Sequence, residues 1–138
     1  MHSIIYTTDR TITVELFRDV LVRSTLGERR PIDNDECLRG MIANTDIMAT
    51  AWDGDNLVGI SRSLTDWHYA CYLADLAVDV AYQRHGIGKQ LIDLTQRQLG
   101  PLCKIILLAA PAANEYYPRI GFEHNPRAWL LEPSRRVR

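Results

Sequence analysis

The stretch Gln83-Arg84-His85-Gly86-Ile87-Gly88, with Lys89 directly behind it, decides how the rest of this 138-residue chain is organised. A strand-like apolar run at 72–80 precedes it, and a helix-like run at 87–99 follows it. The first N–H groups of a helix have no intrahelical partner, and the helix dipole adds partial positive charge there. Glycine permits backbone angles closed to other residues and leaves room for a phosphate. The sequence therefore predicts an anion-binding turn between a strand and a helix.

Two familiar phosphate-binding motifs do not match this stretch. A dinucleotide-binding G-x-G-x-x-G would continue from Gly86 and Gly88 to a third glycine, but that position is Leu91. A P-loop would place Ser or Thr after its Gly-Lys pair, whereas Gln90 follows Lys89. The stretch alone leaves two interpretations open: an anion site, or a tight turn whose glycines serve only the backbone.

The stretch does resemble the Q/R-x-x-G-x-G/A pyrophosphate loop of the GNAT family, the acetyl-CoA-dependent N-acetyltransferases. The resemblance extends upstream through Leu76-Ala77-Val78-Asp79. It continues downstream to the run NEYYPRIGF at 114–122, which is similar to the family's N-x-x-F-Y-x-x-x-G-F ending. Two motifs in the family's order favour the anion site over the plain turn. The N-terminal part of the chain carries no motif that identifies an acceptor.

Composition narrows the class of protein. The chain is 46% hydrophobic and 24% charged, with a net charge of -1, which gives no reason to expect a nucleic-acid partner. The three cysteines, Cys37, Cys71 and Cys103, lack metal-site or disulfide-framework spacing and favour a reducing compartment. Neither a signal peptide nor a membrane span is expected. We therefore expect one cytoplasmic N-acetyltransferase (GNAT-like) domain over 1–138, with a disordered tail at 133–138, no metal and no membrane partner.

Apolar spacing and turn residues predict an α/β fold, an α+β mixed sheet flanked by helices, in the order β-α-α-β-β-β-α-β-α-β-β. Thr11 or Thr13 would cap the first helix, and Asp33 with Glu36 would cap the second. The resemblance implies a splay between the fourth and fifth strands. The expected strands are 3–7, 47–52, 57–64, 69–80, 104–109, one at Phe122 and one at 129–131; the expected helices are 13–23, 33–43, 87–99 and 113–120.

The resemblance also implies where acetyl-CoA would bind. Pantetheine would lie along a strand backbone, and the loop would hold the pyrophosphate. The residues that it assigns to the cofactor are Leu76, Ala77, Val78, Gln83, Arg84, His85, Gly86, Ile87, Gly88, Lys89 and Asn114.

For the chemistry, the resemblance implies that the Val78 N–H polarises the thioester and that Tyr117, rather than its neighbour Tyr116, protonates the leaving thiolate. Asp75 is the candidate general base, because it stands on the central strand directly before Leu76. Two alternatives stay open: Asp75 is a salt-bridged core carboxylate with Arg62 as its cross-strand partner, or water relays the proton.

The expected activity is transfer of acetyl from acetyl-CoA to a primary amine by direct attack in a ternary complex. The acceptor would be a small molecule or a peptide, and the resemblance places Arg29 and Arg30 in the loop that shapes the acceptor site. The alternative is a non-catalytic acyl-CoA-binding or sensing module. The apolar run at 129–131 suggests a homodimer.

Overall fold

The computed structural model describes residues 3–138. The chain divides into two compact units, one reaching to Leu108 and one running from Ala109 to Arg138. The expectation of one domain over 1–138 stays a prediction.

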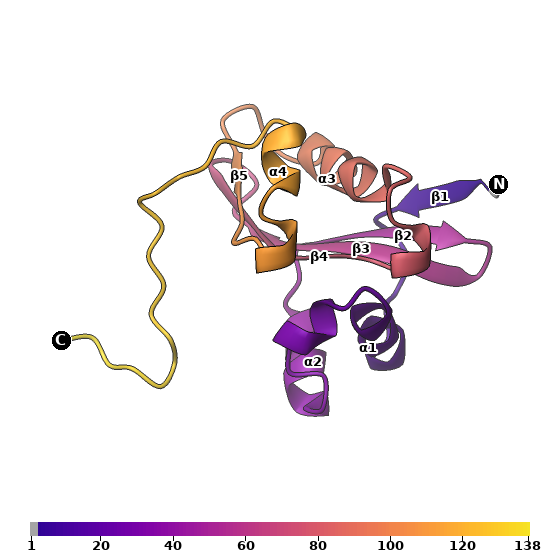
Figure 1. The fold of residues 1–138 in the computed structure, drawn as a ribbon, viewed down its shortest axis with the longest axis horizontal. Coiled ribbons are helices and arrows are strands. Elements are labelled where there is room, and N and C mark those ends of the chain that lie inside the picture. The colour runs from indigo at the N-terminus through magenta and orange to yellow at the C-terminus, as the bar shows by residue number, and fades with distance from the viewer. Residues whose placement is uncertain (1–2) are drawn as a thin grey trace. The chain divides into compact units, whose positions relative to one another are not determined.

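The first unit is built on a five-stranded sheet with the order β1-β2-β3-β4-β5 (Figure 1). Strands β1 (Ile4–Thr7), β2 (Ile47–Asp53), β3 (Asn56–Thr65) and β4 (Ala70–Val78) are antiparallel neighbours. Strand β5 (Lys104–Ile106) lies parallel to β4. This confirms the predicted mixed sheet.

Helices cover both faces of this sheet (Figure 1). α1 (Val14–Arg23) and α2 (Asp35–Ala43) bury Phe17, Leu21 and Leu38 against one face. α3 (Ile87–Arg97) buries Ile87 and Leu91 against the other. No helix in the described part of the chain combines the length and apolarity needed to cross a bilayer.

A glycine in β3 sets how closely α3 approaches the sheet. A Cβ added to Gly59 would lie 3.1 Å from Leu91 Cδ1 and 3.2 Å from Ile87 Cγ2. These contacts are tighter than ordinary van der Waals packing. The missing side chain therefore lets the first turn of α3, and with it the glycine loop, rest directly on the strands.

The helix caps confirm one prediction and correct another. Thr13 caps α1, since its hydroxyl accepts a hydrogen bond from Leu16 N at 3.1 Å. α2 is capped by Asn34, whose Oδ1 accepts from Cys37 N at 2.9 Å, so Asp33 is not the cap. Asp and Asn are about equally good N-caps, and adjacent ones cannot be ranked by spacing. With the helix starting one residue later, Cys37 is exposed.

The second unit and the end of the sheet differ most from the prediction. β5 ends at Ile106, which is 48% exposed, so the expected buried strand over 104–109 is wrong in length and burial. After the short helices η3 (Pro111–Ala113) and α4 (Tyr116–Arg119), the strands expected at Phe122 and 129–131 are not formed. A strand needs a partner for its backbone groups, and the structure gives the run at 129–131 none.

Candidate active site

The glycine loop ends in an uncapped helix N-terminus. Arg84 and Gly86 have positive φ angles of 69° and 78°, which turn the chain into α3. Gly86 is the N-cap residue, and no side chain caps the helix; the first intrahelical bond runs from Gln90 N to Gly86 O at 3.0 Å. A Cβ on Gly86 would meet nothing within 4 Å. The N-terminus of α3 thus has open space beside Gly86 and carries no side-chain cap, as an anion site requires.

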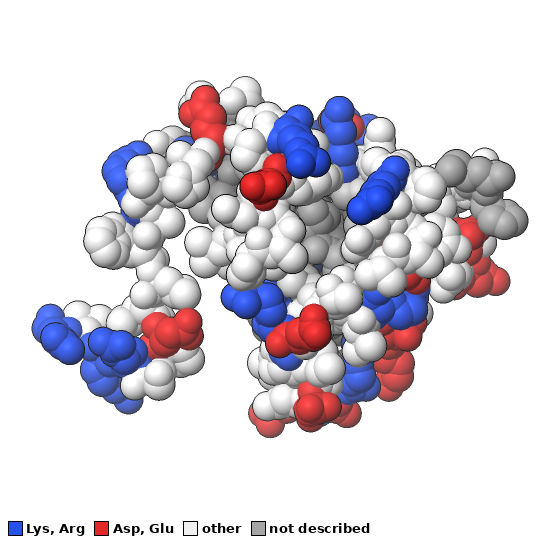
Figure 2. All heavy atoms as spheres, in the orientation of Figure 1, with Lys and Arg blue, Asp and Glu red and all other residues white. Residues whose placement is uncertain are grey.

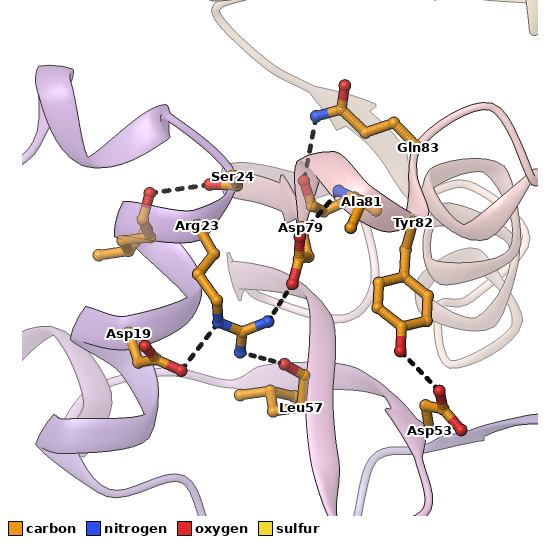
Figure 3. A network of polar contacts seen from close by, with 11 residues as sticks. Asp19, Arg23, Ser24, Asp53, Leu57, Asp79, Ala81, Tyr82 and Gln83 are labelled. Atoms are coloured by element: carbon orange, nitrogen blue, oxygen red, sulfur yellow. Dashed lines mark hydrogen bonds and ion pairs between the residues drawn. The ribbon is translucent and has the colours of Figure 1, made fainter.

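A polar network ties this loop to the opposite helix layer (Figure 3). Asp79, at the end of β4, is 7% exposed and accepts from Ala81 N at 2.8 Å, which shapes the short helix η2 (Val80–Tyr82). Its other carboxylate oxygen pairs with Arg23 at the end of α1. Arg23 also donates to the Leu57 carbonyl and pairs with exposed Asp19. The network fixes the point at which the chain leaves the sheet for the loop.

The electrostatics of this network favour the charged form of Arg23. Burial lowers the pKa of the Arg23 guanidinium, but the hydrogen bonds and charges of Asp79 and Asp19 outweigh burial and raise the pKa overall. The side chain of Arg23 is 25% exposed and that of Asp79 is 10% exposed. The ion pair is therefore mostly shielded from water. Because water competes little with it, the pair holds the start of the loop in place.

Two further contacts hold the loop from its other side (Figure 3). The Tyr82 hydroxyl donates to Asp53 Oδ2 at 2.6 Å, and this hydrogen bond raises the pKa of Tyr82. The Gln83 side chain donates to the Val78 carbonyl at 3.0 Å. Gln83, which the resemblance assigns to the pyrophosphate, thus contacts the end of β4, while Arg84, His85 and Lys89 are exposed.

β4 has one unpaired edge beside this loop. β3 pairs with β4 from Cys71 to Val78, but β5 pairs only with residues 70–72 on the other side. Among the described strands, none pairs with residues 73–78 on that side. Asp79 N donates to Val58 O on β3 at 2.9 Å, so by alternation the N–H and C=O groups of Leu76 and Val78 point to the unpaired side.

A bulge explains where the edge opens. The β3–β4 register shifts between Arg62 and Ser63, which pair with Asp75 and Leu73, so Ala74 is the extra residue on β4. A bulge bends its strand and increases the local twist. It lies just beyond the last residue of β4 that pairs with β5, Tyr72. The splay implied by the family resemblance thus has a local cause in this chain.

Asp75 is a buried carboxylate with two cationic partners. It is 1% exposed, and its two oxygens accept from Arg62 Nε and Arg30 Nε respectively. Arg30 follows η1 (Leu26–Arg29) and also donates to the Ala74 carbonyl at 3.0 Å. Of the roles left open for Asp75, this geometry favours the salt-bridged core carboxylate, with Arg62 as the predicted cross-strand partner.

Tyr117 and Asn114 belong to the second unit. Tyr117 opens α4 with Tyr116 and is half-buried, and Asn114 is exposed. Gly121 has φ 103°, which reverses the chain so that Phe122 N donates to Tyr117 O at 3.1 Å. The rings of Tyr117 and Phe122 then meet edge to face, with centroids 5.4 Å apart. The Gly-Phe pair of the motif therefore holds the tyrosine in place.

Sequence reasoning missed two residues that organise the site. Arg23 was assigned only to the end of a helix, and Arg30 was assigned to the loop that would shape the acceptor site, without a partner. The signal available was indirect: Asp75 and Asp79 interrupt an otherwise apolar strand, and a buried carboxylate needs a partner. The described residues contain no group of three or more His, Cys, Asp or Glu side chains placed to hold a metal ion.

Comparisons with known proteins agree with this arrangement. A family model described as an acetyltransferase (GNAT) domain matches residues 44–124. A protein named histone acetyltransferase TAP1, from Glycine max, is 36% identical over 75 residues, which are 51% of this chain and 31% of that one. The chain thus spans less than a third of the length of this relative.

Solved structures share the fold at low sequence identity. A GNAT family acetyltransferase from Streptococcus pneumoniae superposes with a TM-score of 0.72 at 21% identity, covering 95% of this chain and 98% of that one. A predicted acetyltransferase from Clostridium acetobutylicum, solved with acetyl-CoA, gives a TM-score of 0.70 at 16% identity, covering 94% and 96%.

Proposed function

Since this chain belongs to the GNAT acetyltransferase family, we propose that it is an N-acetyltransferase that moves acetyl from acetyl-CoA to a primary amine. The amine attacks the thioester directly while both substrates are bound. The observation that carries the proposal is the adjacency, within one unit, of an uncapped helix N-terminus and an unpaired strand edge.

The two features suit the two halves of the cofactor. The pyrophosphate binds the N–H groups of the turn from Arg84 to Lys89, where helix dipole and backbone donors coincide. The pantetheine arm, a chain of amides, runs beside β4 and uses the backbone groups of Leu76 that point to its unpaired side, which leaves the Val78 N–H for the thioester. Asn114 is a further residue that the resemblance assigns to the cofactor.

The reaction needs an oxyanion donor and an acid. The amine nitrogen bonds to the thioester carbon, and the carbonyl oxygen that becomes an anion accepts from the Val78 N–H. Collapse of this intermediate breaks the carbon–sulfur bond and expels the CoA thiolate, which takes the proton of the Tyr117 hydroxyl. Water carries away the proton of the amine. Asp75 acts as a positioning residue, because both of its oxygens are engaged by guanidinium groups.

Calorimetric titration with acetyl-CoA tests the cofactor, with ATP and NAD as controls. We expect selective micromolar binding of acetyl-CoA, because neither ATP nor NAD has an extended arm with successive amides that could pair with β4. Equal binding of all three would reduce the site to a general phosphate turn. No binding by folded protein would remove the proposal.

Replacing Tyr117 by Phe separates an enzyme from a sensor of acyl-CoA. An enzyme loses turnover, measured as release of the CoA thiol, while its affinity for acetyl-CoA is unchanged. Tyr116→Phe is the matched control, since that ring lies next to Tyr117 with centroids 5.3 Å apart. Full turnover in Tyr117→Phe would remove the acid role.

Three further expectations remain part of this proposal. The acceptor is a small molecule or a peptide bearing a primary amine. The apolar run at 129–131 mediates a homodimer. The cysteines, free in the structure, fit the predicted cytoplasmic location.

A further inference from the structure

A pocket of about 600 Å³ lies between α2 and β3. Its apolar lining includes Met41 and Leu64, and its polar lining includes Asn34, Glu36 and Arg62. The pocket thus combines a mainly apolar wall with one cationic and one anionic side chain. Side chains of both signs are intermixed on the face that Figure 2 shows, over the region of α1 and α2.

Arg62 brings uncompensated positive charge to this pocket. One carboxylate, Asp75, is shared by the guanidinium groups of Arg62 and Arg30, which leaves a net charge of about +1 on the three side chains. The side chain of Arg62 is 8% exposed. Two guanidinium groups that share one carboxylate are only partly compensated, so an anion that enters the pocket gains electrostatic energy there.

Arg62 also has a donor to spare. Its Nε donates to Asp75 and its Nη1 donates to the Met41 carbonyl at 3.2 Å. The structure gives its Nη2 no hydrogen-bond partner among the described residues. A guanidinium group prefers planar, two-oxygen acceptors, and it offers such donors at a fixed spacing.

The pairing of β3 with β4 connects this pocket to the unpaired edge of β4. Arg62 pairs with Asp75 on β4, and the next residue of β4, Leu76, turns its backbone groups to the unpaired side. Arg30 bridges the two features, because it holds both the Asp75 carboxylate and the Ala74 carbonyl. A ligand anchored at Arg62 is therefore within a few residues of the strand along which acetyl-CoA is proposed to lie.

We propose that the acceptor is an amine that also carries a carboxylate, as an amino acid does. The carboxylate binds Arg62, and the apolar part of the acceptor lies against Met41 and Leu64. A single negative charge matches the surplus of about one positive charge, whereas a phosphate dianion would exceed it and would be repelled by Glu36. This inference rests on the proposed acetyl transfer for the identity of the ligand as an acceptor.

Matched amines test the inference on the unmodified protein. Phenylalanine, phenylalaninamide and phenethylamine share one apolar body and differ at the carboxylate; leucine, leucinamide and isoamylamine form a second set. We expect kcat/KM, followed by thiol release, to be at least about tenfold higher for the amino acids. The amides have the less basic amine, so intrinsic reactivity biases the test against this result. Equal or better turnover of the amides or simple amines overturns the inference.

Variants assign the preference to the pocket. Arg62→Gln should abolish the preference for the carboxylate, whereas Arg62→Lys should keep part of it. Glu36→Gln changes an exposed helix residue, so it should fold normally and raise the kcat/KM of the amino acids. An unchanged preference in both Arg62→Gln and Glu36→Gln overturns the assignment, and should the Arg62 variants not fold, Glu36→Gln alone decides.

Direct binding keeps the two proposals distinguishable. If the protein does not bind acetyl-CoA, the proposed function is wrong. The pocket is then judged separately, by calorimetric titration of N-acetylphenylalanine against N-acetylphenylalaninamide. Tighter binding of the carboxylate supports an anion site in this pocket. Equal or absent binding of the two overturns it, whether or not any amine is turned over.

Discussion

Gly86 is the residue on which the cofactor turn depends, because its φ of 78° lies where L side chains are strained. Gly86→Ala should lower the free energy of unfolding by about 1 kcal/mol, the cost of left-handed backbone for an alanine. The new Cβ meets no protein atom and so points into the space proposed for the pyrophosphate. We therefore expect the Kd for acetyl-CoA to rise about tenfold, or about 1.4 kcal/mol. Urea unfolding and calorimetric titration measure the two effects.

Gly40→Ala is a matched control that should raise the free energy of unfolding instead of lowering it. It lies inside α2, and an added Cβ there would also meet nothing within 4 Å. Since alanine is the better helix former, Gly40→Ala should stabilise the protein by about 1 kcal/mol and leave acetyl-CoA affinity unchanged. If both glycine variants weaken acetyl-CoA binding alike, the turn has no special role.

The contacts of a single residue can be predicted from the sequence when its partners lie close to it along the chain or on the neighbouring strand. Thr13 as a cap and Arg62 as a cross-strand partner of Asp75 were predictable from spacing. Arg30 was not, because it meets Asp75 across 45 positions in the chain. Asn34 and Asp33 are chemically equivalent caps, and only the packing of α2 distinguishes them.

Among the elements, α1 is coupled to the cofactor loop through Arg23. Arg23→Met keeps much of the aliphatic stem but leaves the Asp79 carboxylate, 7% exposed, without its cation. Loss of a hydrogen bond to a buried charge should lower the free energy of unfolding by about 2 kcal/mol. Acetyl-CoA binding should weaken as well, because Asp79 shapes η2 and the start of the loop. Denaturant unfolding and calorimetry report the two changes.

The exposed ion pair between Asp19 and Arg23 is the control for the buried pair between Arg23 and Asp79. It also pairs with Arg23, but its side chain is 59% exposed. Asp19→Ala should therefore change stability by no more than about 0.5 kcal/mol. A loss as large as that of Arg23→Met would mean that the helix surface, and not the link to Asp79, carries the effect.

The turn between β3 and β4 should respond to acid through Asp66. Its carboxylate accepts from the N–H groups of Ala70, Tyr69 and His68, which lower the pKa of Asp66 from 3.8 to about 2. A lowered pKa stabilises the fold above the unfolded value, and this contribution is lost as the pH falls from about 4 to about 2.

The variant Asp66→Asn keeps an accepting oxygen but cannot titrate. Its free energy of unfolding should therefore fall less steeply between pH 4 and pH 2 than that of the unmodified chain. Asp55→Asn, in the preceding turn, is the control, because Asp55 accepts none of the described hydrogen bonds. Parallel pH profiles for the unmodified chain and Asp66→Asn would contradict the prediction.

Elements with their own periodicity were predictable, and elements that depend on a partner were not. The amphipathic helices and the first four strands carry patterns of 3.6 and 2 residues, so their positions follow from the sequence within a few residues. The expected final strands rested on short apolar runs alone. Such a run becomes a strand only when another strand pairs with it, and a local pattern does not reveal that.

For the whole molecule, the run at 129–131 predicts self-association. Trp129, Leu130 and Leu131 are 94%, 68% and 56% exposed, and contiguous exposed apolar side chains mark contact surfaces. We expect sedimentation velocity to show a dimer that dissociates on dilution, because closed two-fold pairs are the commonest way to cover one patch. The double variant Trp129→Glu with Leu130→Glu should be monomeric with an unchanged thermal transition, since neither side chain contributes to the buried core. Val137→Glu, at an 82% exposed residue nearby, should remain dimeric. A monomer at every concentration of the unmodified chain would leave this patch to another partner.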